Sequence, residues 1–348
     1  MVGTASQSPT RPIHLVGSIP LESADVVFDA VSETLGPLLE RVPDGETGKR
    51  ANWIGWQREV FARQEAFEPS ADRERDYQLH PPFRFKPGTV SADLDLGDLG
   101  FAREAIESYG MFERVKADGG FLPDCRFQVC LPTPFAPVYS FVAYRDQGAV
   151  EPHYEARMLE ELEAICAAIP HDELALQWDV ATEMSIFERL FKVPFLGDGA
   201  DAGLVERLAR LGEAVPVGVA LGYHLCYGDM DHRHWKEPKD TGVLVGVANM
   251  ISAAVGRPID WFHLPVPRDR GDVAYFSPLA DLALRPETRL FLGLVHWTDG
   301  VDGASRRISS AGRVISGFGI GTECGLGRRD PDTIKGLLRL HAEVAHVS

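Results

Sequence analysis

The sequence predicts a single-domain α/β protein of the (β/α)8 TIM barrel class. Eight short apolar segments are separated mostly by stretches with helical spacing, which is the element count of such a barrel. The segments are almost continuously apolar, as expected of strands that are buried on both faces. A doubly wound open sheet is the alternative, but no Gly-x-Gly-x-x-Gly opens a helix after the first strand.

The elements follow one another in an order that supports a barrel. The predicted strands span 12–18, 39–42, 126–131, 174–180, a part of 215–226, 259–264, 290–295 and 314–320. The predicted helices span 21–39, 52–66, 101–116, 151–168, 202–214, 241–255 and 331–345.

Three segments fall outside this alternation. Residues 1–11 are small and polar and predict a disordered N-terminal tail, so the barrel spans 12–348. Residues 67–99 are polar and rich in Pro and Asp, which predicts a loop insertion. Residues 132–144 carry three prolines and several aromatic side chains, and we expect a loop that covers a site.

Composition excludes several classes of protein. The net charge of −16 and the pI of about 5.1 argue against a nucleic-acid partner or an anionic membrane surface. Five cysteines in 348 residues do not form a disulfide scaffold. The N-terminus lacks the apolar core of a signal peptide, and no run of about 18 apolar residues predicts a membrane span. We therefore expect a cytoplasmic protein, with a homo-oligomer left open.

One pair of side chains predicts a metal site. His224 and Cys226 close a predicted strand and lie on the same face, because side chains alternate with period two. Cys324 follows the last predicted strand and is the best candidate for a third ligand. Three protein ligands with one open position are typical of catalytic zinc. The alternative is that the cysteines are small buried apolar residues.

Further polar side chains stand at the ends of the other predicted strands. They are Ser18, Glu46, Asp179, His263 and His296. In a barrel the carboxyl ends of all strands share one face, where active sites are built. Trp178, beside Asp179, is expected to line the pocket. Ordinary ion pairs are the alternative for the two carboxylates, and a structural hydrogen bond is the alternative for His296.

Five ordered segments carry a resemblance to a known family. They are HLVGSIP at 14–20, DGE at 44–46, QWD at 177–179, YHLCY at 223–227 and ECGL at 323–326. In these segments the chain resembles the C-terminal catalytic barrel of the cobalamin-independent methionine synthases, within the uroporphyrinogen decarboxylase/methionine synthase superfamily. The resemblance spans nearly the whole chain from residue 14 onward.

The resemblance implies a zinc-dependent methyl- or alkyltransferase that activates a substrate thiol of the homocysteine kind. It implies Zn²⁺ on His224, Cys226 and Cys324, and a substrate amino group held by Glu46 and Asp179. The backbone near Ser18 would receive the amino-acid substrate. Asp179 and His296 are the predicted catalytic residues, His296 as an acid or base near the leaving group. The implied partners are a small-molecule thiol and a methyl or alkyl donor.

The chain also departs from the family pattern. The family's glutamate zinc ligand falls at Pro265, which cannot bind metal through its side chain, and His263 two residues earlier is a candidate substitute. Val180 and Ala181 replace a Glu-Pro pair, and the folate-binding N-terminal half is absent. Other chemistry therefore stays open, namely thiol addition to an epoxide, carbon–sulfur cleavage or decarboxylation. A non-catalytic protein that binds metal or thiols is a third hypothesis.

Overall fold

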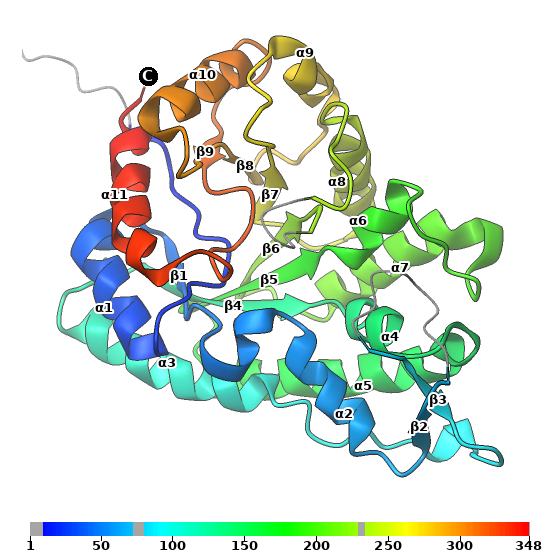
Figure 1. Cartoon of the computed structure of the whole chain (residues 1–348). Coiled ribbons are helices and arrows are strands. Elements are labelled where there is room, and N and C mark those ends of the chain that lie inside the picture. Colours follow the sequence, from blue (N-terminus) through cyan, green and yellow to red (C-terminus); the bar gives the residue numbers. More distant parts are fainter. Residues whose placement is uncertain (1–9, 72–79, 229–233, 348) are drawn as a thin grey trace, which may run out of the picture.

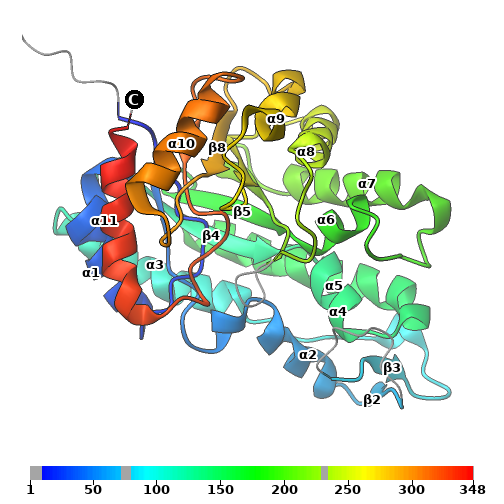
Figure 2. The same ribbon diagram turned by 45° about the horizontal axis from the view of Figure 1, so that its top comes forward.

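The computed structural model describes residues 10–71, 80–228 and 234–347. The chain forms an α/β fold in which helices surround a curled parallel sheet (Figures 1 and 2). The predicted N-terminal tail lies almost entirely in residues 1–9, outside the described residues. In the described part of the chain, no helix combines the length and the apolar character that crossing a membrane requires.

The main sheet of the described residues has seven parallel strands that neighbour one another in chain order. They are β1 (Arg41–Pro43), β4 (Arg126–Pro132), β5 (Leu174–Val180), β6 (Ala220–Leu225), β7 (Trp261–Pro265), β8 (Arg289–Gly293) and β9 (Gly319–Ile320). Each overlaps one of the predicted strands. The range predicted for β8 runs past the end of the strand, and the range predicted for β9 begins well before it. Apolar loop residues beside a buried strand carry the same hydrophobic signal as the strand itself.

The first predicted strand does not form as a strand. Ile13 instead makes one isolated parallel bridge to Leu39, beside β1, and another to Ile320 in β9. The segment therefore lies between the two edge strands without a continuous ladder. The sheet is consistent with a TIM-like barrel that is not fully closed, so the predicted eight-stranded closure is met only in part.

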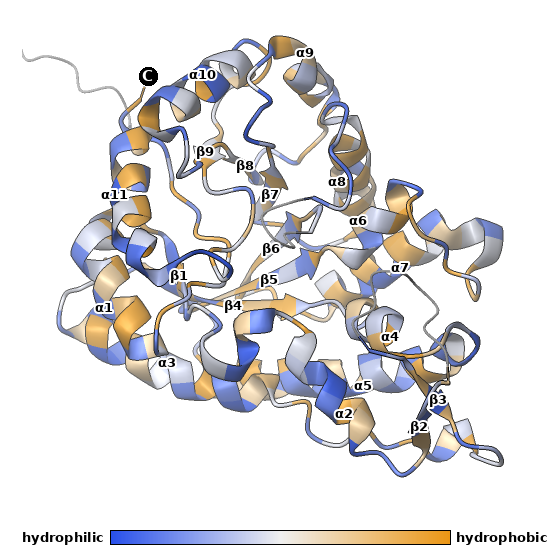
Figure 3. Ribbon diagram, in the orientation of Figure 1, coloured by the Kyte–Doolittle hydropathy of each residue, from blue (hydrophilic) through white to orange (hydrophobic). Residues whose placement is uncertain are grey.

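Seven helices of eight or more residues cover the outside of the described sheet. They are α1 (Ala24–Leu35), α3 (Phe101–Ala117), α5 (Tyr144–Ala168), α7 (Ala200–Glu213), α8 (Gly242–Ala254), α10 (Gly300–Gly312) and α11 (Ile334–Ala345). Helix α1 shows why they pack this way, because Val27, Val31 and Leu35 recur at every fourth position and are buried. Figure 3 shows the resulting apolar strands inside helices of mixed hydropathy.

Four shorter helices lie in the connections, α2 (Arg58–Ala62), α4 (Phe135–Phe141), α6 (Thr182–Phe187) and α9 (Val273–Phe276). Helix α4 corrects the predicted loop at 132–144. Its prolines stand at the N-cap, Pro134, and in the first turn, Pro137, where a missing N–H costs little. Helix α10 was not predicted because its Gly- and Ser-rich sequence has low helix propensity.

The insertion at 67–99 forms an antiparallel pair, β2 (Phe67–Pro69) and β3 (Phe83–Phe85). Phe83 makes an isolated bridge to Val142 at the end of α4. At the other end of the insertion, the Glu161 carboxylate of α5 accepts hydrogen bonds from the backbone N–H groups of Leu99, Gly100 and Ala102. These contacts fasten the insertion to α4 and α5.

The inside of the sheet is layered from apolar to polar. Ala175, Trp261 and Phe291 form a small apolar cluster, and Trp261 requires Gly222 opposite, where a Cβ would lie 1.9 Å from the indole. A buried polar layer follows, in which Nε2 of His14 lies 2.9 Å from the side-chain amide oxygen of Gln177. The candidate site lies beyond this layer, at the carboxyl ends of the strands.

Candidate metal and substrate site

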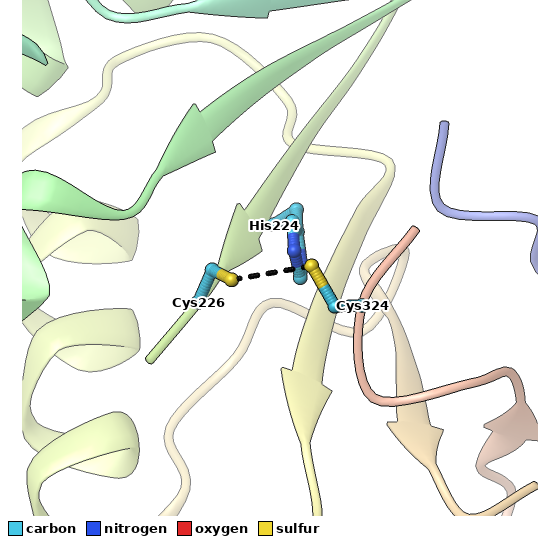
Figure 4. A group of neighbouring side chains, drawn as sticks. All are labelled: His224, Cys226 and Cys324. Atoms are coloured by element: carbon cyan, nitrogen blue, oxygen red, sulfur yellow. Dashed lines mark hydrogen bonds between the residues drawn. The ribbon is translucent and has the colours of Figure 1, made fainter. Parts of the chain in front are cut away.

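The structure brings together the imidazole and the two thiols that the sequence singles out. One potential ligand atom from each of His224, Cys226 and Cys324 lies within 4.8 Å of the others, and in the described part of the chain they are the one group of this kind. The sulfurs of Cys226 and Cys324 point toward each other at 3.5 Å, beside the His224 ring (Figure 4). We call this group the soft corner.

The soft corner fits a zinc ion. Two sulfurs held tetrahedrally at about 2.3 Å from one metal lie about 3.8 Å apart, close to the distance found here. His224 is buried, and its Nε2 atom has no hydrogen-bond partner in the described residues. A buried ring nitrogen without a partner is costly unless its lone pair serves a ligand. Thiolates and imidazole are the donor set that zinc prefers.

Strand geometry and close loop packing place the three groups. His224 lies in β6, and Cys226 follows the strand directly and donates its backbone N–H to the Val180 carbonyl. Cys324 lies in the loop after β9. That loop is bound to Ser18, which accepts from Leu326 N–H with its carbonyl and from Gly327 N–H with its hydroxyl.

The same loop depends on glycine at position 325. A Cβ on Gly325 would lie 2.3 Å from the Ser18 hydroxyl oxygen, which no side chain tolerates. Ser18 also bridges to Gly45, in the turn that follows β1. Ser18, predicted to bind substrate, therefore also fixes the loop that carries Cys324.

His263 lies next to the soft corner and outside the group of three. Its Nδ1 atom is 2.7 Å from Nδ1 of His224, and the two residues face each other in the register of β6 and β7. Burial lowers the pKa of His263 to about 3, and burial followed by the His263 charge lowers the pKa of His224 well below its ordinary value. Both rings are therefore neutral, and one proton lies between their Nδ1 atoms.

Glu46 and Asp179 form a second polar region, which we call the carboxylate corner. Glu46 follows β1 in a turn with a positive φ of 49°, and its N–H donates to Asp44. Asp179 accepts from the Gln177 amide at 2.9 Å, and the Trp53 side chain also donates to it. In the described residues no basic side chain acts on Asp179, which removes the ion-pair alternative for that residue, whereas the nearby charges of Arg50 and Arg328 lower the pKa of Glu46.

Burial raises the pKa of both acids in the carboxylate corner. For Glu46 the charge of Asp179 is the second cause, after burial. For Asp179 burial outweighs the hydrogen bonds from Gln177 and Trp53, which lower its pKa. Two acids with raised pKa values that face one cavity are a common feature of functional sites.

Both corners line one cavity of about 360 Å³. Its wall includes Ser18, Glu46, Asp179, His224, Cys226 and Cys324. Aromatic side chains of Trp53, Phe141 and Trp235 line other parts of it, and Arg58 and His80 add basic groups. The size suits a small-molecule ligand.

Three predicted site residues do not line the cavity, namely His263, Trp178 and His296. Trp178 is fully buried on the face of β5 opposite Asp179, because neighbouring side chains of a strand point to opposite sides. The prediction that Trp178 lines the pocket is therefore wrong. His296 is buried, and its Nε2 lies 2.9 Å from the Val266 carbonyl, to which it donates. Burial lowers the pKa of His296 to about 4.

Sequence reasoning missed a charged pair beside the soft corner. The polar segment DHRH at 231–234 predicts a surface loop for His232 and His234, yet the side chain of His234 is only 7% exposed and its Nε2 lies 3.2 Å from Glu323. Burial opposes protonation, but the hydrogen bond and charge of Glu323 raise the pKa of His234 to about 9. The position of Glu323 directly before Cys324 was the available signal. His232 lies outside the described residues.

Comparison with known proteins shows the fold. No model of a known protein family and no curated protein matches the sequence. Among solved structures, the chain is similar to a B12-independent methionine synthase from Shewanella sp. W3-18-1 in complex with selenomethionine, with a TM-score of 0.58, 17% identity and 97% of each chain covered. It is also similar to a methyltransferase from Methanosarcina mazei, with a TM-score of 0.53, 12% identity and coverage of 96% of this chain and 94% of the other.

Proposed function

We propose that the protein is a zinc-dependent methyl- or alkyltransferase that acts on a small thiol. The observation that carries the proposal is the convergence of His224, Cys226 and Cys324 on the wall of a cavity that also contains two buried acids, Glu46 and Asp179. The shared fold of a methionine synthase and a methyltransferase supports it. The protein would act in the cytoplasm, where a reducing environment keeps both cysteines in the reduced state.

The soft corner would hold the metal with three protein ligands. A bound zinc ion would lower the pKa of a substrate thiol, so that its sulfur attacks the donor carbon while the leaving group departs with the electron pair. Pro265 stands where the resemblance places a fourth protein ligand and offers no side-chain donor. The chain thus keeps a position open for the substrate.

His263 would position His224 rather than bind the metal. For Nε2 of a neutral His224 to act as a ligand, Nδ1 of His224 must carry the ring proton. Its N–H then donates a hydrogen bond to Nδ1 of His263. A partner of this kind fixes both the tautomer and the orientation of a ligating imidazole. This assignment replaces the expectation that His263 serves as the fourth ligand.

The carboxylate corner would bind the ammonium group of an amino-acid thiol. Burial raises the pKa of Glu46 and Asp179, and an ammonium would offset the cost of ionising them inside the cavity. Binding at this corner would hold the substrate while its sulfur reaches the soft corner. The reacting groups would then meet in a fixed orientation, which is a large part of catalysis in displacement reactions.

A second candidate is acid–base chemistry on the same fold without a thiol nucleophile, such as decarboxylation or carbon–sulfur cleavage. The raised pKa values of Glu46 and Asp179 favour it, because at least one acid keeps its proton near neutral pH. Under this alternative the protein needs no metal.

Metal analysis separates the two candidates. The purified protein and the Cys324→Ser variant are compared by elemental analysis after purification without chelators. The matched control is Cys166→Ser, which changes a buried cysteine of α5 that does not line the cavity. We expect one zinc per chain in the unmodified protein and the control, and none in Cys324→Ser. Absence of zinc from all three would contradict the proposal and favour acid–base chemistry.

A further inference from the structure

Arg58, a basic side chain of the cavity, has no acidic partner among the residues that the structure describes. Arg58 begins α2 and lines the cavity, half-buried. Its guanidinium lies over the Phe83 ring, 4.6 Å from the ring centre. Within the described residues it makes no ion pair and no hydrogen bond, so the aromatic face of β3 is its one specific contact.

Other half-buried arginines of the described residues use their N–H donors, either on carboxylates or, as in Arg126 and Arg285, on backbone carbonyls. Arg50 lies 2.7 Å from a carboxylate oxygen of Asp44, and Arg207 binds both oxygens of Glu151. A guanidinium carries five N–H donors, and an aromatic ring satisfies none of them by a conventional hydrogen bond. Arg58 therefore presents unused donors and a full positive charge to the cavity.

The wall around Arg58 differs from the wall around the acids. Arg58 comes from the segment before the insertion, and the lining also includes His80 of the insertion and Phe141 of α4. Glu46 follows β1 and Asp179 lies in β5, both strands of the main sheet. The lining thus combines acids from the sheet with Arg58 from an outer helix, while a second arginine of the lining, Arg328 in the loop after β9, lowers the pKa of Glu46 by its charge.

We propose that Arg58 binds an anionic group, a carboxylate, sulfonate or phosphate, on the alkyl donor. The inference rests on the proposed function, which assigns the soft corner to the thiol sulfur and the carboxylate corner to the ammonium of the same molecule. Arg58 is then left for the second substrate. A planar guanidinium suits these anions because it donates two parallel hydrogen bonds to their oxygens.

Binding of inorganic sulfate tests the subsite without a known donor. Sulfate is titrated at constant ionic strength against chloride, and the fluorescence of Trp53 and Trp235, which line the cavity, reports binding. We expect saturation in the unmodified protein, about 10–100-fold weaker binding in Arg58→Ala, and an intermediate loss in Arg58→Lys. Arg313→Ala is the matched control, since Arg313 is exposed and does not line the cavity.

Equal sulfate affinity in Arg58→Ala and the unmodified protein, or no saturation in either, would overturn the subsite. The titration is repeated with Cys324→Ser, which lacks a proposed metal ligand. Retained binding there is expected, since the anion subsite does not require the metal. The subsite and the metal proposal can therefore fail separately.

Competition with a thiol distinguishes the two substrates. Sulfate is titrated with and without saturating L-homocysteine. An unchanged sulfate affinity assigns Arg58 to the donor, because both ligands then bind together. Competition would instead show that Arg58 holds the carboxylate of the thiol substrate and would overturn the donor assignment.

Discussion

The two polar corners of the cavity both lie at the carboxyl ends of strands, but they offer different chemical groups to a ligand. The soft corner combines neutral His224 with two thiols, and its buried Nε2 has no hydrogen-bond partner in the described residues. The carboxylate corner holds two acids whose pKa values burial raises. One corner offers lone pairs to a soft cation, and the other offers negative charge to an ammonium. The difference suggests that they serve two ends of one substrate.

The largest effect should come from removing a thiol of the soft corner. In Cys226→Ser, zinc affinity should fall more than the roughly 10–100-fold typical of losing an outer-shell partner, since a direct ligand is lost. Competition with a chromophoric chelator measures this, and Cys166→Ser again serves as the control. Unchanged zinc affinity in Cys226→Ser would place any metal elsewhere.

Replacing His263 should cause the next largest loss of zinc affinity. In His263→Leu the Nδ1 partner of His224 is lost, and zinc affinity should fall about 10–100-fold. The absorption spectrum of the cobalt-substituted protein should keep its shape and intensity, because the number of ligands is unchanged. His263→Asn, which retains an acceptor, should recover part of the affinity. A cobalt spectrum that changes coordination number in His263→Leu would show that His263 is itself a ligand.

The soft corner and His263 also show how much of the site can be predicted from the sequence. Period-two alternation and the position after a strand were enough to bring His224, Cys226 and Cys324 together, because strands impose that geometry. The same rule, applied to Trp178, would have put it on the face opposite Asp179. The contact between His224 and His263 depends on the register of two neighbouring strands, which the sequence does not encode locally.

The fold was predictable to a similar degree and for similar reasons. Buried strands such as β5 carry a strong local pattern and were found with their correct bounds. Helix α10 was missed because its residues have low propensity and it is held in place by tertiary contacts. One of these is Arg307, which binds Asp299 and the Leu294 carbonyl. The partner of Arg58 was unpredictable for the same reason, since β3 approaches α2 only in the folded chain.

The carboxylate corner can be tested with substrates that differ by one charge. In Asp179→Asn, KM for L-homocysteine should rise about 10–100-fold, as expected for the loss of a charge-assisted hydrogen bond. KM for 3-mercaptopropionate, which lacks the amino group, should change little. Parallel increases for both thiols would mean that Asp179 shapes the cavity and does not recognise ammonium. Activity is followed as alkylation of the thiol by a common donor.

The smallest effect concerns the pH dependence of stability. Because burial raises the pKa of Glu46 in the folded protein, the folded state binds a proton that the unfolded state releases above its ordinary pKa of about 4.5. Stability from this group is present below that pKa and is lost as the pH rises through the folded value. In Glu46→Gln the decline in the free energy of unfolding between pH 5 and about 8 should be shallower.

Urea denaturation of the metal-free protein at a series of pH values measures this decline. Glu59→Gln is the control, because Glu59 is exposed on α2 and lies outside the cavity. An identical pH profile in Glu46→Gln and the unmodified protein would mean that solvent relieves the burial of Glu46. In that case Glu46 would already be ionised at neutral pH, and an ammonium would bind it without offsetting a cost of ionisation. A shallower profile would instead favour two acids acting together, since the charge of each raises the cost of ionising the other.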